Sequence, residues 1–292
     1  MVRDLDKIFK SSKKIEIDND SKIVIMSDCH RGIGNNYDNF SKNKYLYNKA
    51  LDYYYKRGFV YIELGDGDEM WEVADYNDIV LANINIFKHI KKFHSDGRLI
   101  MIYGNHDMAK KFMNNVDNYL YNYYDNFLGE EKVLFNDLIF YESLVLNYNN
   151  YDIFLIHGHQ VDFINNRFWR FTRFFIRNIW RFFEKIGVND FTNVIKNNSV
   201  SNRIEKKLEK WSLKKNIMLI AGHTHRAIFP KMGCSLYFND GSCVHPDGIT
   251  CIEIEIGKIS LVRWNYNIDK NNLISIERNV IEGNEEIINF FK

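Results

Sequence analysis

The segment RLIMIYGNHD (98–107) passes from an apolar run straight into polar residues that can carry chemistry. A short apolar run such as RLIMIY (98–103) is typical of a buried strand. Two similar runs come earlier in the chain: IVIMS (23–27) and FVYIEL (59–64). The segments between these runs, 38–57 and 75–95, are predicted to be helices. Strands and helices alternating at this spacing indicate βαβ units and a mainly parallel sheet, hence an α/β fold.

The second half of the chain is richer in strand patterns. IFYESLVLNY (139–148) and YDIFLIHG (151–158) are predicted to form a hairpin that turns at Asn149-Asn150. NIMLIAG (216–222) is a further buried run. Residues 234–265 hold three more, the last two joined by a turn at Gly257-Lys258. We expect these strands to form a second sheet packed on the first.

Residues 160–215 interrupt the strand pattern with a long helical stretch in which arginines recur among aromatic residues. They are predicted to be a helical insert, or cap, on a single domain spanning 1–292. Arg167 and Arg170 lie in it. Four interpretations stay open: a lid whose arginines bind a pyrophosphate, a surface that meets anionic lipid, a grip on single-stranded nucleic acid, or helices that pack on the core.

Composition limits the class of protein. The chain has 292 residues, 46% of them hydrophobic, and a net charge of +1, so it is no polycation. Its four cysteines lie far apart and form no CxxC pair, which argues against a zinc ribbon or a disulfide framework. We see no signal peptide and no apolar run long enough to span a bilayer, and therefore expect a cytoplasmic protein.

Polar residues follow five of the apolar runs at the point where each run ends. They are Asp28 and His30 after 23–27; Asp66 after 59–64; Asn105, His106 and Asp107 after 98–103; His157 and His159 after IFLI; and His223 and His225 after IMLI. Alternate residues at a strand end point the same way, and open α/β sheets bind ligands at that edge. Asparagine offers a neutral oxygen ligand, and His106 is a candidate acid oriented by Asp107. Alone, each segment also fits a turn or a helix cap, but together they indicate one site.

The pattern D-x-H, G-D-x-x-[DE], G-N-H-[DE], H and G-H-x-H resembles the calcineurin-like metallophosphoesterases from residue 23 to about residue 226. The resemblance implies a four-layer αββα sandwich of two packed sheets with a dinuclear metal centre at the sheet edge. Carried over, Asp28, His30 and His225 hold one metal, Asn105, His157 and His223 hold the other, and Asp66 bridges them.

The resemblance also implies a reaction. A hydroxide that bridges two divalent metals attacks phosphorus, while His106 stabilises the transition state or protonates the leaving oxygen. The mixed nitrogen and oxygen ligands favour Mn²⁺, with Fe, Zn and Mg as alternatives.

Three features bear on the branch of the family. The sequence GDGDEMWE (65–72) lacks the V-D-R-G of protein Ser/Thr phosphatases, which makes that branch less favoured. The run LGDGDEMWE, the H-G-x-x-x-D pattern from His157 and the insert resemble UDP-2,3-diacylglucosamine pyrophosphohydrolases, although those enzymes usually carry Asp where His159 stands. Arg31 follows D-x-H and either reaches a substrate phosphate or caps a surface turn.

The expected substrate is a phosphorylated small molecule or a nucleotide-linked compound, cleaved as a phosphomonoester, phosphodiester or pyrophosphate. Peripheral contact with a membrane or lipid through the insert is a further expectation, and no obligate protein partner is evident. The alternative function is a nuclease or a single-stranded nucleic-acid-binding protein, against which the neutral overall charge counts. An inactive scaffold would need a broken ligand set, and every ligand position is filled.

Overall fold

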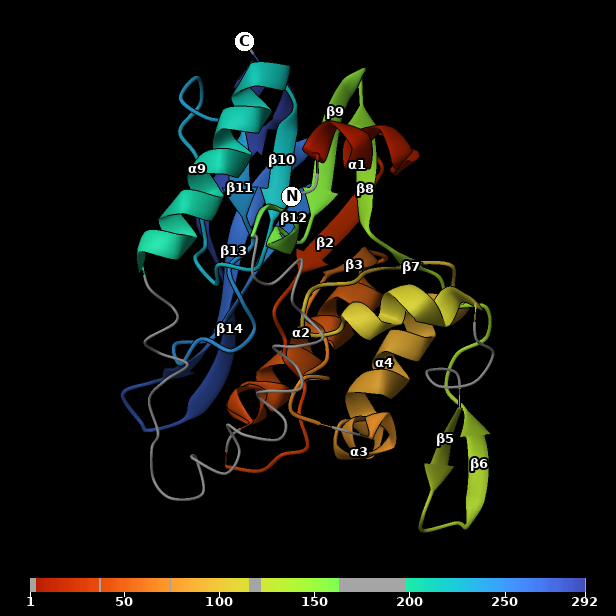
Figure 1. Ribbon diagram of the computed structural model, residues 1–292. Helices are drawn as coiled ribbons and strands as arrows, with labels where there is room; N and C mark the ends of the chain where they lie inside the picture. The colour runs from red at the N-terminus through yellow and green to blue at the C-terminus, as the bar shows by residue number, and fades with distance from the viewer. Residues whose placement is uncertain (1–3, 37, 74, 116–121, 163–197, 292) are drawn as a thin grey trace.

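Two β-sheets lie face to face in the computed structural model, and helices cover their outer faces (Figure 1). The structure describes residues 4–36, 38–73, 75–115, 122–162 and 198–291. Two of the five described helices lie on one outer side of the sandwich: α1 (Leu5–Ser11) and α9 (Asn198–Lys215). The other three lie on the opposite side: α2 (Lys44–Lys56), α3 (Tyr76–Ala82) and α4 (Ile84–Ser95). The predicted four-layer αββα sandwich is confirmed.

The first sheet has seven strands in the order β14-β13-β12-β2-β3-β4-β7. Their bounds are β2 (Lys22–Met26), β3 (Val60–Leu64), β4 (Leu99–Ile102), β7 (Phe140–Tyr141), β12 (Ile249–Glu255), β13 (Lys258–Ile268) and β14 (Ile274–Glu286). The strands β2, β3, β4 and β7 pair in parallel, whereas β12, β13 and β14 pair antiparallel. The parallel half comes from the alternating strand–helix pattern.

The second sheet has five strands in the order β1-β8-β9-β10-β11. Their bounds are β1 (Lys13–Ile17), β8 (Ser143–Tyr148), β9 (Tyr151–Ile156), β10 (Met218–Ala221) and β11 (Tyr237–Asn239). The predicted hairpin between β8 and β9 is present and antiparallel, while the other three pairings are parallel. A separate hairpin is formed by β5 (Asn122–Asp125) and β6 (Glu130–Val133).

Three apolar cores separate the four layers. In β2, Val24 and Met26 face the core beneath α2 and α4, whereas Ile23 and Ile25 face the core between the sheets. This period of two is the normal geometry of a strand that is buried on both faces. A third core joins α1 and α9 to the outer face of the second sheet.

The assignment of residues 234–265 to the second sheet is wrong for β12 and β13. The strand β12 pairs with β2, and β13 and β14 extend the first sheet beyond it. The parallel crossovers from β2 to β3 and β4 leave the other edge of β2 open, and the later strands add there. The pattern within a buried strand does not reveal which sheet it joins.

The predicted helix 75–95 is two helices, α3 and α4, that meet at Asn83. The Asn83 side chain donates hydrogen bonds to the carbonyls of Ile79 and Gly32. Its backbone leaves the helical region (φ −120°, ψ 26°), which ends α3.

The predicted helix 38–57 likewise divides in two, into a 3₁₀ turn (Asn39–Lys42) and α2. The last predicted turn lies at Ile256-Gly257, one residue earlier than expected, since Glu255 pairs with Lys258.

The helix α9 occupies the last third of the predicted insert. It packs Ile204 and Leu208 against the outer face of the second sheet and so forms part of the sandwich. The remainder of the insert, 163–197, lies outside the described residues. Among the residues that the structure describes, no helix is long and apolar enough to cross a bilayer.

The role of α9 is tested by Leu208→Ala, because Leu208 is fully buried in the third core. We expect the free energy of unfolding to fall by about 2–5 kcal/mol, from lost burial and the resulting cavity. On the same helix Leu213 is 49% exposed, and Leu213→Ala should cost less than about 0.5 kcal/mol. Denaturant unfolding of both variants measures this difference, and equal effects would exclude α9 from the core.

Candidate metal centre

Five strands end at one edge of the sandwich, and the predicted ligands follow them. The strands β2, β3 and β4 come from the first sheet, and β9 and β10 from the second. Five of the seven predicted ligands have a backbone in the left-handed region, with φ between 47° and 68°: Asp28, His30, Asp66, His223 and His225. This conformation is uncommon for residues other than glycine and concentrates at functional sites.

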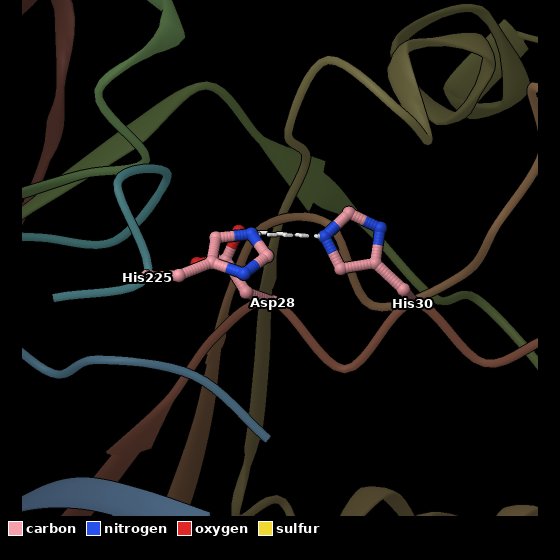
Figure 2. Close-up of side chains that lie close together, drawn as sticks. All are labelled: Asp28, His30 and His225. Carbon is pink, nitrogen blue, oxygen red and sulfur yellow. Dashed lines mark hydrogen bonds and ion pairs between the residues drawn. The ribbon is translucent and has the colours of Figure 1, made fainter. Parts of the chain in front are cut away.

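The first ligand group consists of Asp28, His30 and His225 (Figure 2). The Nε2 atoms of His30 and His225 lie 3.3 Å apart. Asp28 Oδ1 lies 3.0 Å from His225 Nε2 and 3.6 Å from His30 Nε2. Residues almost 200 positions apart in the sequence therefore turn three donor atoms toward one point.

The second group consists of Asp66, His157 and His223. Asp66 Oδ2 lies 3.1 Å from His157 Nε2 and 3.9 Å from His30 Nε2 of the first group. Asp66 thus belongs to the second group and also lies near the first, so its carboxylate would be placed to serve ions held by both. The backbone N–H of His106 donates to Asp66 Oδ1 over 2.8 Å. Its sequence neighbour Asn105 is buried.

Asp28 and His157 each use one side-chain atom in a fixing contact and turn another atom toward the site. Asp28 Oδ2 lies 2.5 Å from Ser27 Oγ and accepts the backbone N–H of His223 over 2.8 Å. His157 Nδ1 lies 2.8 Å from the carbonyl oxygen of Leu64, so it is the donor there. Such contacts fix the tautomer and orientation of metal ligands.

Buried atoms without hydrogen bonds test whether this site fits metal ions. Asp28 Oδ1, Asn105 Oδ1 and His157 Nε2 are among the buried side-chain atoms of the described residues that have no assigned hydrogen-bond partner. Asp28 Oδ1 and His157 Nε2 each face another candidate ligand, at 3.0 Å and 3.1 Å. Buried polar atoms are normally satisfied, so three that point into one place indicate a ligand there. Carboxylate, amide and imidazole donors are those that first-row divalent metals bind, and the residues fit two such ions.

Electrostatics support the same assignment. Burial alone would raise the pKa of Asp28, but His225 and His157 lower this pKa well below its usual range. Burial alone would lower the pKa of His157, but Asp66 and Asp28 raise it to about 9. The neighbouring imidazoles thus lower the pKa values of both Asp28 and Asp66, which favours the charged form that binds cations.

Behind Asp28, Ser27 Oγ also lies 2.7 Å from Oδ1 of the fully buried Asp240. Burial raises the pKa of Asp240 well above its usual range. Ser27 Oγ thus lies within hydrogen-bond distance of two buried carboxyl groups. Because Ser27 and the backbone N–H of His223 hold Oδ2 of Asp28, its Oδ1 is the oxygen that faces the ligand group.

Close packing explains the glycines of the motifs. A Cβ atom at Gly104 would lie 2.1 Å from Asp66 Oδ1, and one at Gly65 would lie 2.5 Å from His157 Nδ1. Both positions therefore require glycine so that ligands of neighbouring loops can approach the backbone.

The orienting partner of His106 is Glu69, and the prediction that Asp107 has this role is wrong. His106 Nδ1 lies 2.9 Å from Glu69 Oε1, and His30 Nδ1 lies 3.0 Å from Glu69 Oε2. Burial alone would lower the pKa of His106, but Glu69 and Asp66 raise it. Glu69 stood in the G-D-x-x-[DE] pattern, yet spacing alone did not reveal its partner.

Asp107 instead points away from the metal ligands into a buried ion-pair network. It accepts hydrogen bonds from the backbone N–H groups of Gly104 and Gly67 and from Lys110 Nζ. Sequence neighbours at a strand exit face opposite ways, which separates Asp107 from His106.

Arg31 belongs to the same network, which contradicts both predictions for it. The side chain is fully buried, with Nε 2.7 Å from Asp68 Oδ1 and Nη1 2.7 Å from Glu63 Oε2. Lys110 Nζ lies 2.7 Å from Asp68 Oδ2 and completes the network. Arg31 therefore contacts neither solvent nor a substrate phosphate. The carboxylates of Glu63, Asp68 and Asp107 are paired with these two cationic side chains and do not form a further metal site apart from the two ligand groups.

The other predicted substrate residues are placed only in part. His159 is buried, and its ring centroid lies 5.6 Å from that of His157 and 6.5 Å from that of His223. It is a neighbour of the second ligand group, and its contact with substrate stays a prediction. Arg167 and Arg170 lie outside the described residues.

A family model for the calcineurin-like phosphoesterase superfamily domain matches residues 22–256, most of the 292-residue chain. The chain belongs to this superfamily, and the sequence-based resemblance is confirmed. Fold and site together define a metal-dependent phosphoesterase in the general sense. No curated protein sequence matches the chain significantly.

Solved structures with a related fold are more distant. Vacuolar protein sorting 29 from Cryptosporidium parvum is 13% identical, with a TM-score of 0.37 over 89% of this chain and 98% of that one. An archaeal phosphodiesterase is 14% identical, with a TM-score of 0.38 over 88% and 99%. A cold-active protein tyrosine phosphatase of a Shewanella species is 12% identical, with a TM-score of 0.39 over 90% and 83%. Since these values are low, the family assignment rests on the sequence match.

Removing Ser27 Oγ should weaken metal binding, because Asp28 would lose the contact that fixes its orientation. We expect Ser27→Ala to lower Mn²⁺ affinity about 10–100-fold in a calorimetric titration. The control is Ser212→Ala, which removes a buried hydroxyl bonded to Ile217 O on the far side of the second sheet. Equal affinities in both variants would contradict a positioning role for Ser27.

Arg31→Met should destabilise the protein, because it leaves the buried carboxylates of Glu63 and Asp68 short of a cation. We expect a loss of about 3–5 kcal/mol in the free energy of unfolding. Arg57→Met is the control, since Arg57 is 46% exposed in its side chain and its ion pair with Glu255 should contribute about 0–1 kcal/mol. A raised KM with unchanged stability would instead restore Arg31 as a substrate residue.

Proposed function

We propose that the chain is a dinuclear metal-dependent phosphohydrolase acting on phosphate esters. The observation that carries this proposal is that two groups of metal-binding side chains lie side by side: Asp28, His30 and His225, and Asp66, His157 and His223. Each group contains a buried donor atom with no assigned hydrogen-bond partner, Asp28 Oδ1 in the first and His157 Nε2 in the second. Asn105 Oδ1 adds a neutral donor to the second group. The mixed donors favour Mn²⁺, with Fe, Zn and Mg as alternatives.

When bound, two such ions polarise a phosphoryl oxygen and generate a nucleophile at neutral pH. The protein's own residues supply the rest. The carboxylates of Asp28 and Asp66 and the imidazoles beside them would hold these ions, since other atoms of the same side chains are fixed by hydrogen bonds. Buried walls reduce the local dielectric and strengthen each electrostatic contact.

His106 is the proposed acid that protonates the leaving oxygen. Its Nδ1 faces Glu69, so Nε2 is the nitrogen left to donate a proton to the substrate. The side chain is 24% exposed, which makes it accessible from the site. A neighbouring carboxylate that holds the imidazole in place is the usual arrangement for a general acid.

The substrate stays open among phosphomonoesters, phosphodiesters and pyrophosphates, including the nucleotide-linked lipids that the sequence resemblance suggests. The pyrophosphate and the nucleic-acid alternatives depend on arginines in 163–197, outside the described residues. No residue in the described ranges gives an independent reason to prefer the nuclease or nucleic-acid alternative.

Activity on p-nitrophenyl phosphate and bis(p-nitrophenyl) phosphate with added Mn²⁺ tests the proposal. Asp66→Ala and His223→Ala should reduce turnover to background and lower the metal content measured by mass spectrometry. His245→Ala is the matched control, because His245 is 51% exposed in its side chain, pairs with Asp247 and belongs to neither ligand group. A purified protein that stays inactive with every divalent ion would overturn the proposal.

A further inference from the structure

The imidazole of His106 is enclosed on three sides. Its ring stacks on the Trp71 indole, with centroids 4.0 Å apart and planes at 19°. The ring of His30 meets it edge-on at 4.5 Å and 87°. Glu69 occupies Nδ1. These three contacts leave the Nε2 edge as the direction in which His106 can act.

Trp71 is itself held firmly. The residue is 4% exposed, and its backbone N–H donates to Glu69 Oε1 over 3.2 Å. The same carboxylate therefore fixes the Trp71 backbone and the Nδ1 atom of His106. Glu69 and Trp71 together support the imidazole. The stacked Trp71 ring limits its tilt, and the contact of Glu69 with Nδ1 limits its rotation.

We propose that Trp71 is a positioning residue for His106 and that the supported Nε2 adapts the site to esters whose leaving group is a strongly basic alkoxide. This inference rests on the proposed phosphohydrolase function. As an oxygen of water bonds to phosphorus, the P–O bond to the alkoxide breaks and the phosphoryl group is released as phosphate. The leaving alkoxide oxygen takes the proton of His106 Nε2 and departs as an alcohol. A weakly basic leaving group such as p-nitrophenolate departs without that proton.

The stacked indole contributes by holding the acid in a productive direction. Misplacement of a catalytic group by about 1 Å can cost a factor of about 100 in rate. An indole that merely fills space would lack this selectivity, since its loss would affect every substrate alike.

The test compares two esters of the same phosphoryl group, one with a p-nitrophenyl and one with an alkyl leaving group. Suitable pairs are p-nitrophenyl phosphate with glycerol phosphate, or thymidine 5′-(p-nitrophenyl phosphate) with dithymidine phosphate. The pair used is the one that the wild-type protein, loaded with Mn²⁺, cleaves. Trp71→Leu should lower kcat on the alkyl ester about tenfold or more, and on the p-nitrophenyl ester less than about twofold.

Two variants and two measurements keep the outcomes distinct. Trp71→Phe retains a flat ring and should restore most of the rate on the alkyl ester. Trp211→Leu removes an indole that packs on Phe9 and Phe154, away from the ligand groups, and should leave the ratio of the two rates unchanged. Metal content and thermal melting are measured for every variant.

Equal losses on both esters would overturn the positioning role, and so would a raised KM with unchanged kcat, which would assign Trp71 to substrate binding. In either case the wild type stays active and the phosphohydrolase function stands. A wild type that cleaves neither ester with Mn²⁺ or another divalent ion would instead overturn the proposed function, and the role of Trp71 with it.

Discussion

The ionised carboxylates of Asp28 and Asp66 are buried where five strands end, and the rest of the site depends on compensating their charge. A buried charge without partners is strongly unfavourable. Histidines that follow β9 and β10 contact one oxygen of each carboxylate. Hydroxyl or backbone N–H groups contact the other oxygen. Both sheets contribute these groups, so the site forms only when the sandwich is complete.

The loops that carry the ligands have unfavourable backbone conformations, which their neighbours stabilise. A left-handed residue other than glycine costs about 1–2 kcal/mol. The loop after β2 is joined to the loop after β3 by backbone hydrogen bonds from Asp28, His30 and Arg31 to the carbonyls of residues 65, 66 and 67. The isolated bridge between Arg31 and Asp68 continues this pairing. Cross-linked loops hold the donor atoms in place before any ion binds.

Much of this arrangement could be predicted from the sequence. Buried apolar runs located the central strands, and the polar residues after them located the candidate ligand groups, because parallel strands bring their carboxyl ends to one edge. Sheet membership of β12 and β13 was not predictable, since strand pairing depends on which edge of β2 remains open. The strands β1 and β14 have a less apolar pattern, with mostly exposed or half-buried residues, and gave no clear signal.

The errors at Arg31 and Asp107 share one cause. Three pairs of sequence neighbours divide between the metal site and the buried ion-pair network: His30 and Arg31, Glu69 and Asp68, His106 and Asp107. In each pair one side chain faces the candidate ligands and the other faces away, so a motif of adjacent polar residues mixes proposed functional and structural members. The network rigidifies the same peptide segments whose other side chains form the proposed site. Under the proposed function, stability and activity are therefore carried by adjacent residues on the same loops, and substitutions of either neighbour separate the two effects.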